Sequence, residues 1–155
     1  MVTITIDANT SALTDKLNPA TIDIDTSGLT SKLSPDKAAQ AKQKGLEYGS
    51  QELVRVLMRN SPVDHGLLKM WHISEQSDEE IHIRSPATYA QYVNDGTQPH
   101  WIEPKNVKAL HWDGNFSKGH YVGGITGRHF VEDSIDDVSG RLDGYFLKAL
   151  QEVLG

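Results

Sequence analysis

The sequence predicts an α+β fold, with a small, mostly antiparallel sheet packed against a long helix in the N-terminal half and a C-terminal helix. Apolar residues recur at helical spacing over residues 36–60 and again over residues 130–153. Short alternating runs, typical of strands, lie between these two segments. With 155 residues, of which 37% are hydrophobic and 23% charged, the chain can bury one core but is short for two full domains.

The first 35 residues contain a duplication. The stretch TIDANTSALTDKLNP (5–19) aligns with TIDIDTSGLTSKLSP (21–35) at a spacing of 16 residues. Each copy has a short alternating run, which predicts a strand, followed by a helical turn that carries a pair of leucines. Two copies are too few for a solenoid, which needs about three stacked units. We therefore expect a duplicated strand–turn arm over residues 1–35 and a main domain over residues 36–155.

A long helix is expected over residues 36–60. Ser34 can accept hydrogen bonds from the first turn, and the proline that follows it suits the first helical position. Three leucines recur near helical spacing until the sequence RNSP ends the pattern. Because glycine costs about 1 kcal/mol relative to alanine inside a helix, Gly45 or Gly49 is where this helix is expected to bend.

Strands are expected in the middle of the chain. Residues 68–73 and 81–84 alternate between apolar and polar, and the polar stretch SEQSDEE between them predicts a β-hairpin with a long loop. Two further strands, over residues 107–112 and 119–124, are expected to pair across the turn DGNFSK.

Two more helical segments complete the predicted fold. The stretch SPATYAQYVNDGT (85–97) predicts a short helix that Asp95 and Gly96 close. The pattern over residues 130–153 is amphipathic and is interrupted near Gly140 or Gly144.

Charge and cysteine content limit the classes of function. A net charge of -6 disfavours DNA as the main ligand, because phosphate binding normally needs clustered Lys and Arg. The chain has no cysteine, which excludes disulfides and cysteine zinc sites and is consistent with cytoplasmic synthesis. No secretory signal is recognisable at the N-terminus, and no run approaches the roughly 20 apolar residues that span a bilayer. We expect neither export nor membrane insertion.

Seven histidines raise the alternative of a small metal-dependent hydrolase. His100 and Glu103 could converge on a metal ion with His111 and His129. No pair has the i, i+4 spacing of a zincin, and no clustered ligand motif is present. Alternating polar positions in strands are the plainer explanation of several of these histidines.

Other catalytic patterns are missing. The glycine-rich stretch GHYVGGITGRHF (119–130) matches neither phosphate-binding loop pattern, and there is no G-x-S-x-G elbow and no thiol nucleophile. Adjacent residues on a turn, such as Asp64 and His65, point apart more often than they form a dyad. The sequence therefore predicts no catalytic residue, no cofactor and no enzymatic activity.

Aromatic residues gather in the centre of the chain, beside glycines and prolines. Any one of them is most simply explained by core packing. A set clustered beside loops also suits a protein–protein interface, where Trp and Tyr are enriched.

Three segments in order resemble a known family. They are SPVDHGLLKMWHI (61–73), ATYAQYVNDGTQPHWIEPKNVKALHW (87–112) and GRHFVEDSIDD (127–137). Together they resemble the tail-component family of long-tailed bacteriophages and prophages, the head–tail neck or tail-completion proteins. The resemblance covers about residues 36–153.

The matching motifs can be followed along the sequence. The family's P-V-D-T-G-x-L turn is similar to PVDHGLL, with His65 in place of the usual Thr. Its Y-A-x-Y-V-E-x-G-T segment is similar to YAQYVNDGT, and its P-H-x-I-x-P-K extension to PHWIEPK. Where the family often has R-P-F this chain has RHF, so His129 departs from the proline.

The resemblance implies a non-enzymatic structural protein of the virion, made in the host cytoplasm and located in the tail or neck. It implies a homo-oligomeric ring, expected to have six copies, that acts in tail completion or head–tail joining. The implied partners are connector or head-completion proteins and tail-terminator or tail-tube proteins. An acidic chain also suits a conduit through which DNA passes without sequence specificity. A cellular protein-binding module that shares the turn motifs is a further alternative.

A closed ring needs a heterologous interface. We expect it on segments 62–73 and 89–112, with the N-terminal arm as a clasp on a neighbouring copy. The candidate contact residues are Asp64, Leu67, Trp71, Tyr89, Tyr92, Thr97, His100, Trp101, Glu103 and Trp112.

Overall fold

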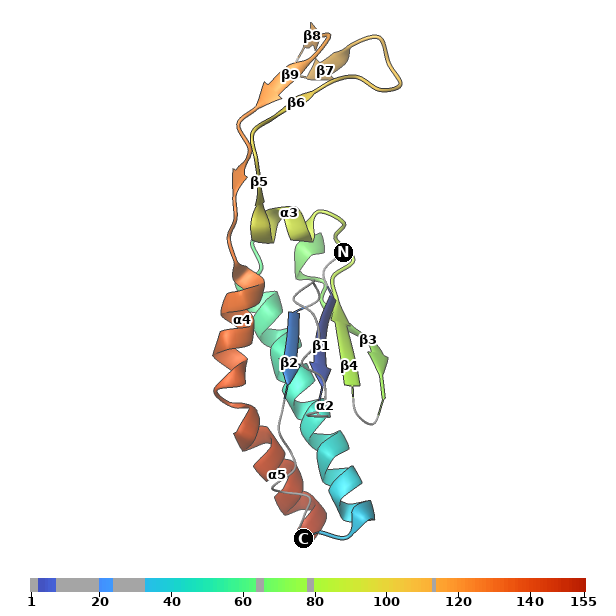
Figure 1. Cartoon of the computed structure of the whole chain (residues 1–155), viewed down its shortest axis with the longest axis vertical. Coiled ribbons are helices and arrows are strands. Elements are labelled where there is room, and N and C mark those ends of the chain that lie inside the picture. The colour runs from blue at the N-terminus through green and yellow to red at the C-terminus, as the bar shows by residue number, and fades with distance from the viewer. Residues whose placement is uncertain (1–2, 8–19, 24–32, 64–65, 78–79, 113) are drawn as a thin grey trace. The chain divides into compact units, whose positions relative to one another are not determined.

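A computed structural model describes residues 3–7, 20–23, 33–63, 66–77, 80–112 and 114–155 (Figure 1). The α+β class is confirmed. The chain divides into two compact units. One, here called the body, consists of Met1–Ala90 and Phe130–Gly155, and the other, here called the central segment, is Gln91–His129. The division into an arm over residues 1–35 and a domain over residues 36–155 stays a prediction.

The body contains a four-stranded sheet in the order β2-β1-β4-β3. Its strands are β1 (Thr3–Asp7), β2 (Ala20–Asp23), β3 (His72–Gln76) and β4 (Glu80–Arg84). Strand β4 pairs antiparallel with both β1 and β3. The β3–β4 pair is the hairpin that the polar stretch between the two strands predicts. Strands β1 and β2 are parallel, which makes the sheet mixed at that edge.

The two copies of the N-terminal repeat lie side by side in this sheet. Thr5 pairs with Thr21, and the next two pairs along β1 and β2 follow the same offset of 16 residues. Positions that are equivalent in the duplication are therefore neighbours in the ladder. The leucine-bearing turns predicted after each strand lie almost wholly outside the described residues.

The first predicted strand of the hairpin begins later than expected. Residues Leu67–Lys69 form a 3-10 turn, η1, and β3 starts only at His72. Gly66 precedes the turn with a φ of 79°, a left-handed conformation that favours glycine. Because residues 67–69 form this turn, they cannot belong to the strand that the alternating pattern predicted from residue 68.

The described part of the body contains three helices. Helix α2 spans Pro35–Asn60, as the proline at its start and the leucine spacing predict, but the Ser34 side chain makes no capping hydrogen bond. Helices α4 (Phe130–Ser139) and α5 (Leu142–Leu154) replace the predicted C-terminal helix, with the interruption at Gly140. Helices α2 and α4 contact the sheet, and α5 packs on α2. Figure 1 shows α4 and α5 following one another along α2, and both contact it.

Gly45 and Gly49 do not interrupt α2. They lie where α5 crosses it: a Cβ on Gly45 would overlap the ring of Phe146, and one on Gly49 would lie 2.9 Å from Cδ2 of Leu142. Glycine at these two positions lets the helix axes approach closely. The glycines that suggested a bend are explained by packing.

The core of the body lies between α2, β4 and the C-terminal helices. Its fully buried side chains include Leu46, Leu53 and Leu57 of α2 and Ile81 and Ile83 of β4. The alternation of buried and half-buried residues along β4 directs both isoleucines to the same face of the sheet. Each such side chain contributes about 1.5–3 kcal/mol through burial.

The central segment contains most of a short helix, α3 (Ala90–Asp95), followed by three short ladders. Helix α3 is followed directly by Gly96, whose φ is 81°. The strands are β5 (Gly96–Thr97), β6 (His100–Ile102), β7 (Leu110–Trp112), β8 (Asn115–Ser117), β9 (His120–Val122) and β10 (Ile125–Thr126). They pair antiparallel as β5 with β10, β6 with β9, and β7 with β8.

The predicted pairing within this segment is wrong. Residues 107–112 and 119–124 were expected to form one hairpin, but β7 pairs with β8 and β9 pairs with β6. Gly114, with a φ of 79°, permits a turn directly after β7, so the chain reverses earlier than the sequence DGNFSK suggests. The strand at 120–122 then continues back along residues 100–102.

Candidate interaction surface

Trp71 is part of the core. Its side chain is only 2% exposed, and its Nε1–H donates to Oγ of Ser61 at 2.8 Å. The Ser61 hydroxyl in turn donates to the carbonyl oxygen of Leu57 at 2.6 Å, which fixes the end of α2. The indole also packs edge-to-face on Phe130, at 6.4 Å between ring centroids. Trp71 therefore supports the fold, and we leave it out of the contact surface proposed below.

An exposed apolar turn surrounds the predicted Leu67. Leu67 lies on η1 and is partly exposed, and Val63 and Met70 on either side of it are exposed as well. Asp64 lies outside the described residues. Tyr89 is half-buried in the turn before α3.

Backbone hydrogen bonds join the two ends of the central segment. The amide of Arg128 donates to the carbonyl oxygen of Val93 at 3.1 Å, and the amide of His129 donates to that of Asn94 at 3.0 Å. Thr97 is half-buried here, and its Oγ1 accepts from the amide of Ile125 at 3.1 Å. Glycine is required at Gly96, because a Cβ there would meet the backbone of the returning strand. Thr97 thus has a structural partner within the segment.

Trp101 is held in place but remains exposed. Its ring lies against Gly119, where a Cβ would overlap the indole, and 57% of the residue is accessible to solvent. Tyr121 lies opposite Trp101 in the β6–β9 ladder and is also exposed. Tyr92, on α3, is 60% exposed.

The other predicted contact residues differ in how much the structure says of them. His100 is exposed, with Nδ1 placed 2.9 Å from the carbonyl oxygen of Gln98. Glu103 is exposed just after β6. Trp112 lies in β7, but its side chain is outside the described part of the structure.

Exposed apolar residues also lie outside the ten candidate contacts, although Phe116 and Tyr121 belong to the central aromatic set that suits an interface. Phe116 is 74% exposed and packs on His111 with ring centroids 4.6 Å apart. Val107, Tyr121 and Ile125 are exposed too. The strands that carry Phe116, Tyr121 and Ile125 are only two or three residues long, which is too short for the sequence to show an alternating pattern.

The side chains of the metal hypothesis are not grouped. Within the described ranges no three or more His, Cys, Asp or Glu side chains are placed to hold a metal ion. His111 instead packs against Phe116, and His100 lies beside Gln98.

Among the residues that the structure describes, no helix is long and apolar enough to cross a membrane.

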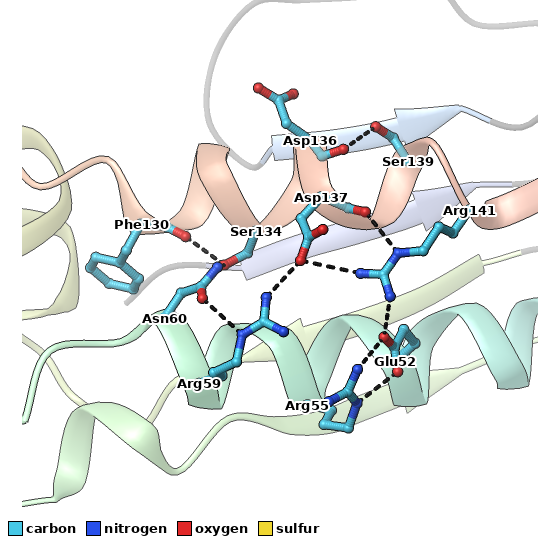
Figure 2. Close-up of polar contacts among 10 residues, drawn as sticks. All are labelled: Glu52, Arg55, Arg59, Asn60, Phe130, Ser134, Asp136, Asp137, Ser139 and Arg141. Carbon is cyan, nitrogen blue, oxygen red and sulfur yellow. Dashed lines mark hydrogen bonds and ion pairs between the residues drawn. The ribbon is translucent and has the colours of Figure 1, made fainter.

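A polar network that the sequence did not reveal joins α2 to α4 and to Arg141, the residue before α5 (Figure 2). The Glu52 carboxylate accepts from Arg55 Nε at 2.8 Å and from Arg141 Nη1 at 2.8 Å. Asp137 pairs with Arg59 Nη2 at 2.6 Å and with Arg141 Nη2 at 3.2 Å. Arg141 therefore links a carboxylate on α2 to one on α4.

The network perturbs one carboxyl group and ends in a buried hydrogen bond. The Arg55 guanidinium, through its hydrogen bond and charge and with help from Arg141, lowers the pKa of Glu52 below its ordinary value. At the far end, Asn60 Nδ2 donates to Ser134 Oγ at 3.0 Å, and that hydroxyl donates to the carbonyl oxygen of Phe130 at 2.6 Å. The contacts hold the C-terminal helices in register along α2.

Comparison with known families gives one match. Residues 29–96 match the model of the HK97-gp10-like family, described as "Bacteriophage HK97-gp10, putative tail-component". The matched region contains α2, η1, β3, β4 and α3. No curated protein and no solved structure matches the chain. The match confirms the resemblance over these residues and indicates a structural protein of the phage tail.

Proposed function

We propose that this chain, whose residues 29–96 match the HK97-gp10-like family model, is a non-enzymatic virion protein of the head–tail neck. It would act in tail completion or head–tail joining. The observation that carries the proposal is the family match, because it covers helix α2, the turn η1 and the β3–β4 hairpin of the body. The location that follows is the tail or neck of the virion.

We further propose that the protein works as a ring, with six copies expected, between connector or head-completion proteins and tail-terminator or tail-tube proteins. Two features support an assembly role. Large apolar side chains such as Trp101, Phe116 and Val63 are exposed, and such side chains are typical anchors of protein interfaces. The net charge of -6 would also keep passing DNA from adhering to the ring wall.

Deletion of the gene from its phage or prophage tests this function. Electron micrographs of the lysate should show DNA-filled heads beside free, complete tails, because heads and tails should each assemble without the protein that joins them. A plasmid copy carrying the unchanged chain should restore joined particles. Normal tailed particles in the deletion lysate would contradict the proposal, and so would the absence of any assembled tails, which would place the protein in the tail itself.

Binding of the purified chain to its neighbours gives an independent test. Connector rings and tail-tube rings from the same phage are mixed with the chain and separated by sedimentation. We expect co-sedimentation with at least one of the two. No binding to either ring, from a chain that is folded by circular dichroism, would contradict a joining role.

A further inference from the structure

The central segment, residues 91–129, exposes the apolar side chains that a folded unit would normally bury. No described apolar side chain in it is fully buried, and Trp101, Phe116, Tyr121 and Ile125 are each more than half exposed. Its three ladders have only two or three residue pairs each. Because isolated two-stranded hairpins are marginally stable in water, the segment needs another surface to cover these side chains.

The exposed rings are positioned before any partner binds. Gly119 leaves room for the indole of Trp101 to lie on the opposite strand, and the cross-strand partner of Trp101 is Tyr121. His111 supports the ring of Phe116 in the same way. Side chains held in one place lose less conformational entropy on binding, so they are effective anchors.

The two units carry opposite charge. The central segment has four Lys or Arg and three Asp or Glu, a net charge of +1, and it holds four of the seven histidines. The remainder of the chain has 11 Lys or Arg and 18 Asp or Glu, a net charge of -7. Lys105, Lys108 and Lys118 are all exposed. The charge on the segment is too small for strong DNA binding, but it is complementary to the body of the same protein.

We infer that the central segment of one copy docks through its exposed aromatic residues on the acidic body of a second copy. The inference rests on the proposed ring and says which parts of the chain form its interface. Each copy then offers one apolar, weakly basic surface and one acidic surface. Such a pair makes a heterologous contact that can close into a ring, with charge guiding the approach and the aromatic residues supplying the affinity.

Photocrosslinking with isotope mixing tests the contact directly. Benzoylphenylalanine replaces Phe116 in unlabelled full-length chain, which is mixed with ¹⁵N-labelled chain and irradiated at a concentration where oligomers form. Crosslinks between light and heavy peptides should fall in the body, within residues 33–90 or 130–155 of the other copy. Crosslinks confined to one chain, or joining two central segments, would overturn the inference.

Paired charge reversals test the complementarity. Lys105→Glu with Lys108→Glu and, as the matched control, Lys37→Glu with Lys44→Glu both change the net charge from -6 to -10. We expect the first pair to raise the dissociation constant of the oligomer by about tenfold or more, and the control to leave it unchanged or lower it. Equal weakening by both pairs would show general charge repulsion and overturn the inference.

Truncation of the anchor gives a result that does not depend on charge. Trp101→Ser should raise the same dissociation constant by about tenfold or more, while circular dichroism of the helices in the body stays unchanged. An oligomer that is unaffected by Trp101→Ser and Phe116→Ser together would overturn the inference. So would salt-sensitive binding of duplex DNA by the unchanged chain that is lost with Lys105→Glu and Lys108→Glu while the oligomer persists.

These outcomes separate the inference from the proposed function. A chain that assembles through the central segment but is dispensable for joining heads to tails would overturn the neck role and leave the docking contact standing. A chain that joins heads to tails, but whose crosslinks from position 116 fall only on connector or tail proteins, would overturn the docking contact and leave the neck role standing.

Discussion

The body and the central segment contain the same kinds of apolar residue but use them differently. In the body, Trp71 is buried, hydrogen-bonded to Ser61 and packed on Phe130. In the central segment, Trp101 is held over Gly119 with more than half of its surface in water. The body therefore has a core of its own, whereas the segment has ordered strands without a core. The difference points to stability as the role of the first and assembly as the role of the second.

The two tryptophans provide the sharpest test of this difference. Trp71→Ala should lower the free energy of unfolding by about 3–5 kcal/mol, because it leaves a cavity and removes the N–H that donates to the Ser61 hydroxyl oxygen. Trp101→Ala should change it by about 1 kcal/mol or less in dilute, unassembled protein. Urea unfolding followed by circular dichroism measures both. Similar losses for the two variants would show that the segment shares the stability of the body.

The close crossing of α2 and α5 allows a second test, at glycines. Gly45→Ala should lower the free energy of unfolding by about 1–3 kcal/mol, since the added methyl overlaps Phe146 in a packed core. Gly144→Ala is the matched control: it lies in α5, and a Cβ there meets nothing within 4 Å. Higher helix propensity should make the control more stable by up to about 1 kcal/mol. Gly45→Ala protein as stable as the control would mean that the helices are further apart.

The polar network of Figure 2 should make the stability of the body depend on pH. Because the pKa of Glu52 is lowered in the folded protein, the carboxylate stabilises the fold above its ordinary pKa of 4.5, and this contribution is lost as the pH falls through the folded pKa. At pH 7, Glu52→Gln should cost about 1–2 kcal/mol.

The cost of Glu52→Gln should shrink as the pH falls below about 4.5. Thermal unfolding of both proteins from pH 7 to pH 3 measures it. A double-mutant cycle with Arg141→Gln should give a coupling energy of about 0.5 kcal/mol or more. A cost that is the same at all pH values would show that the negative charge of Glu52 does not stabilise the fold.

The smallest expected effect is at the return from the central segment to the body. His129 has a φ of 48°, which disfavours any residue with a Cβ, and its amide donates to Asn94. His129→Gly should raise the free energy of unfolding by a few tenths to about 1 kcal/mol. His129→Pro should lower it, because proline fixes φ near −65° and has no N–H. Stabilisation by proline would show that this return has another backbone conformation.

The sequence predicted those parts of the fold that depend on local signals. The helix at 35–60 follows from its proline, its leucine spacing and the proline after it, and the break between α4 and α5 follows from Gly140. The duplication predicted two equivalent strands, although nothing in it revealed that they would pair with each other. The order of the tail-component motifs agreed with the family match over residues 29–96.

Features that depend on long-range contacts could not be predicted. Strands of two or three residues have too little alternation to show which partner they pair with, so the partners of 110–112 and 120–122 were assigned wrongly. Trp71 and Trp101 look alike in sequence, since each lies next to a histidine near the start of a short strand. Only their spatial neighbours, Ser61 for the first and Gly119 for the second, distinguish them. Arg141 gave no signal at all, because its partners lie 89 positions and one helical turn away.

Hydrogen exchange measured below and above the concentration of assembly shows whether a second copy stabilises the central segment. Amide exchange of the full-length chain is measured by mass spectrometry at a concentration where it is monomeric and again where it is assembled. Peptides from residues 91–129 should exchange rapidly in the monomer and slow by about tenfold or more on assembly, while peptides from α2 and β4 stay protected throughout. Strong protection of residues 91–129 in the monomer, unchanged by assembly, would contradict the claim that this segment is stabilised by a second copy.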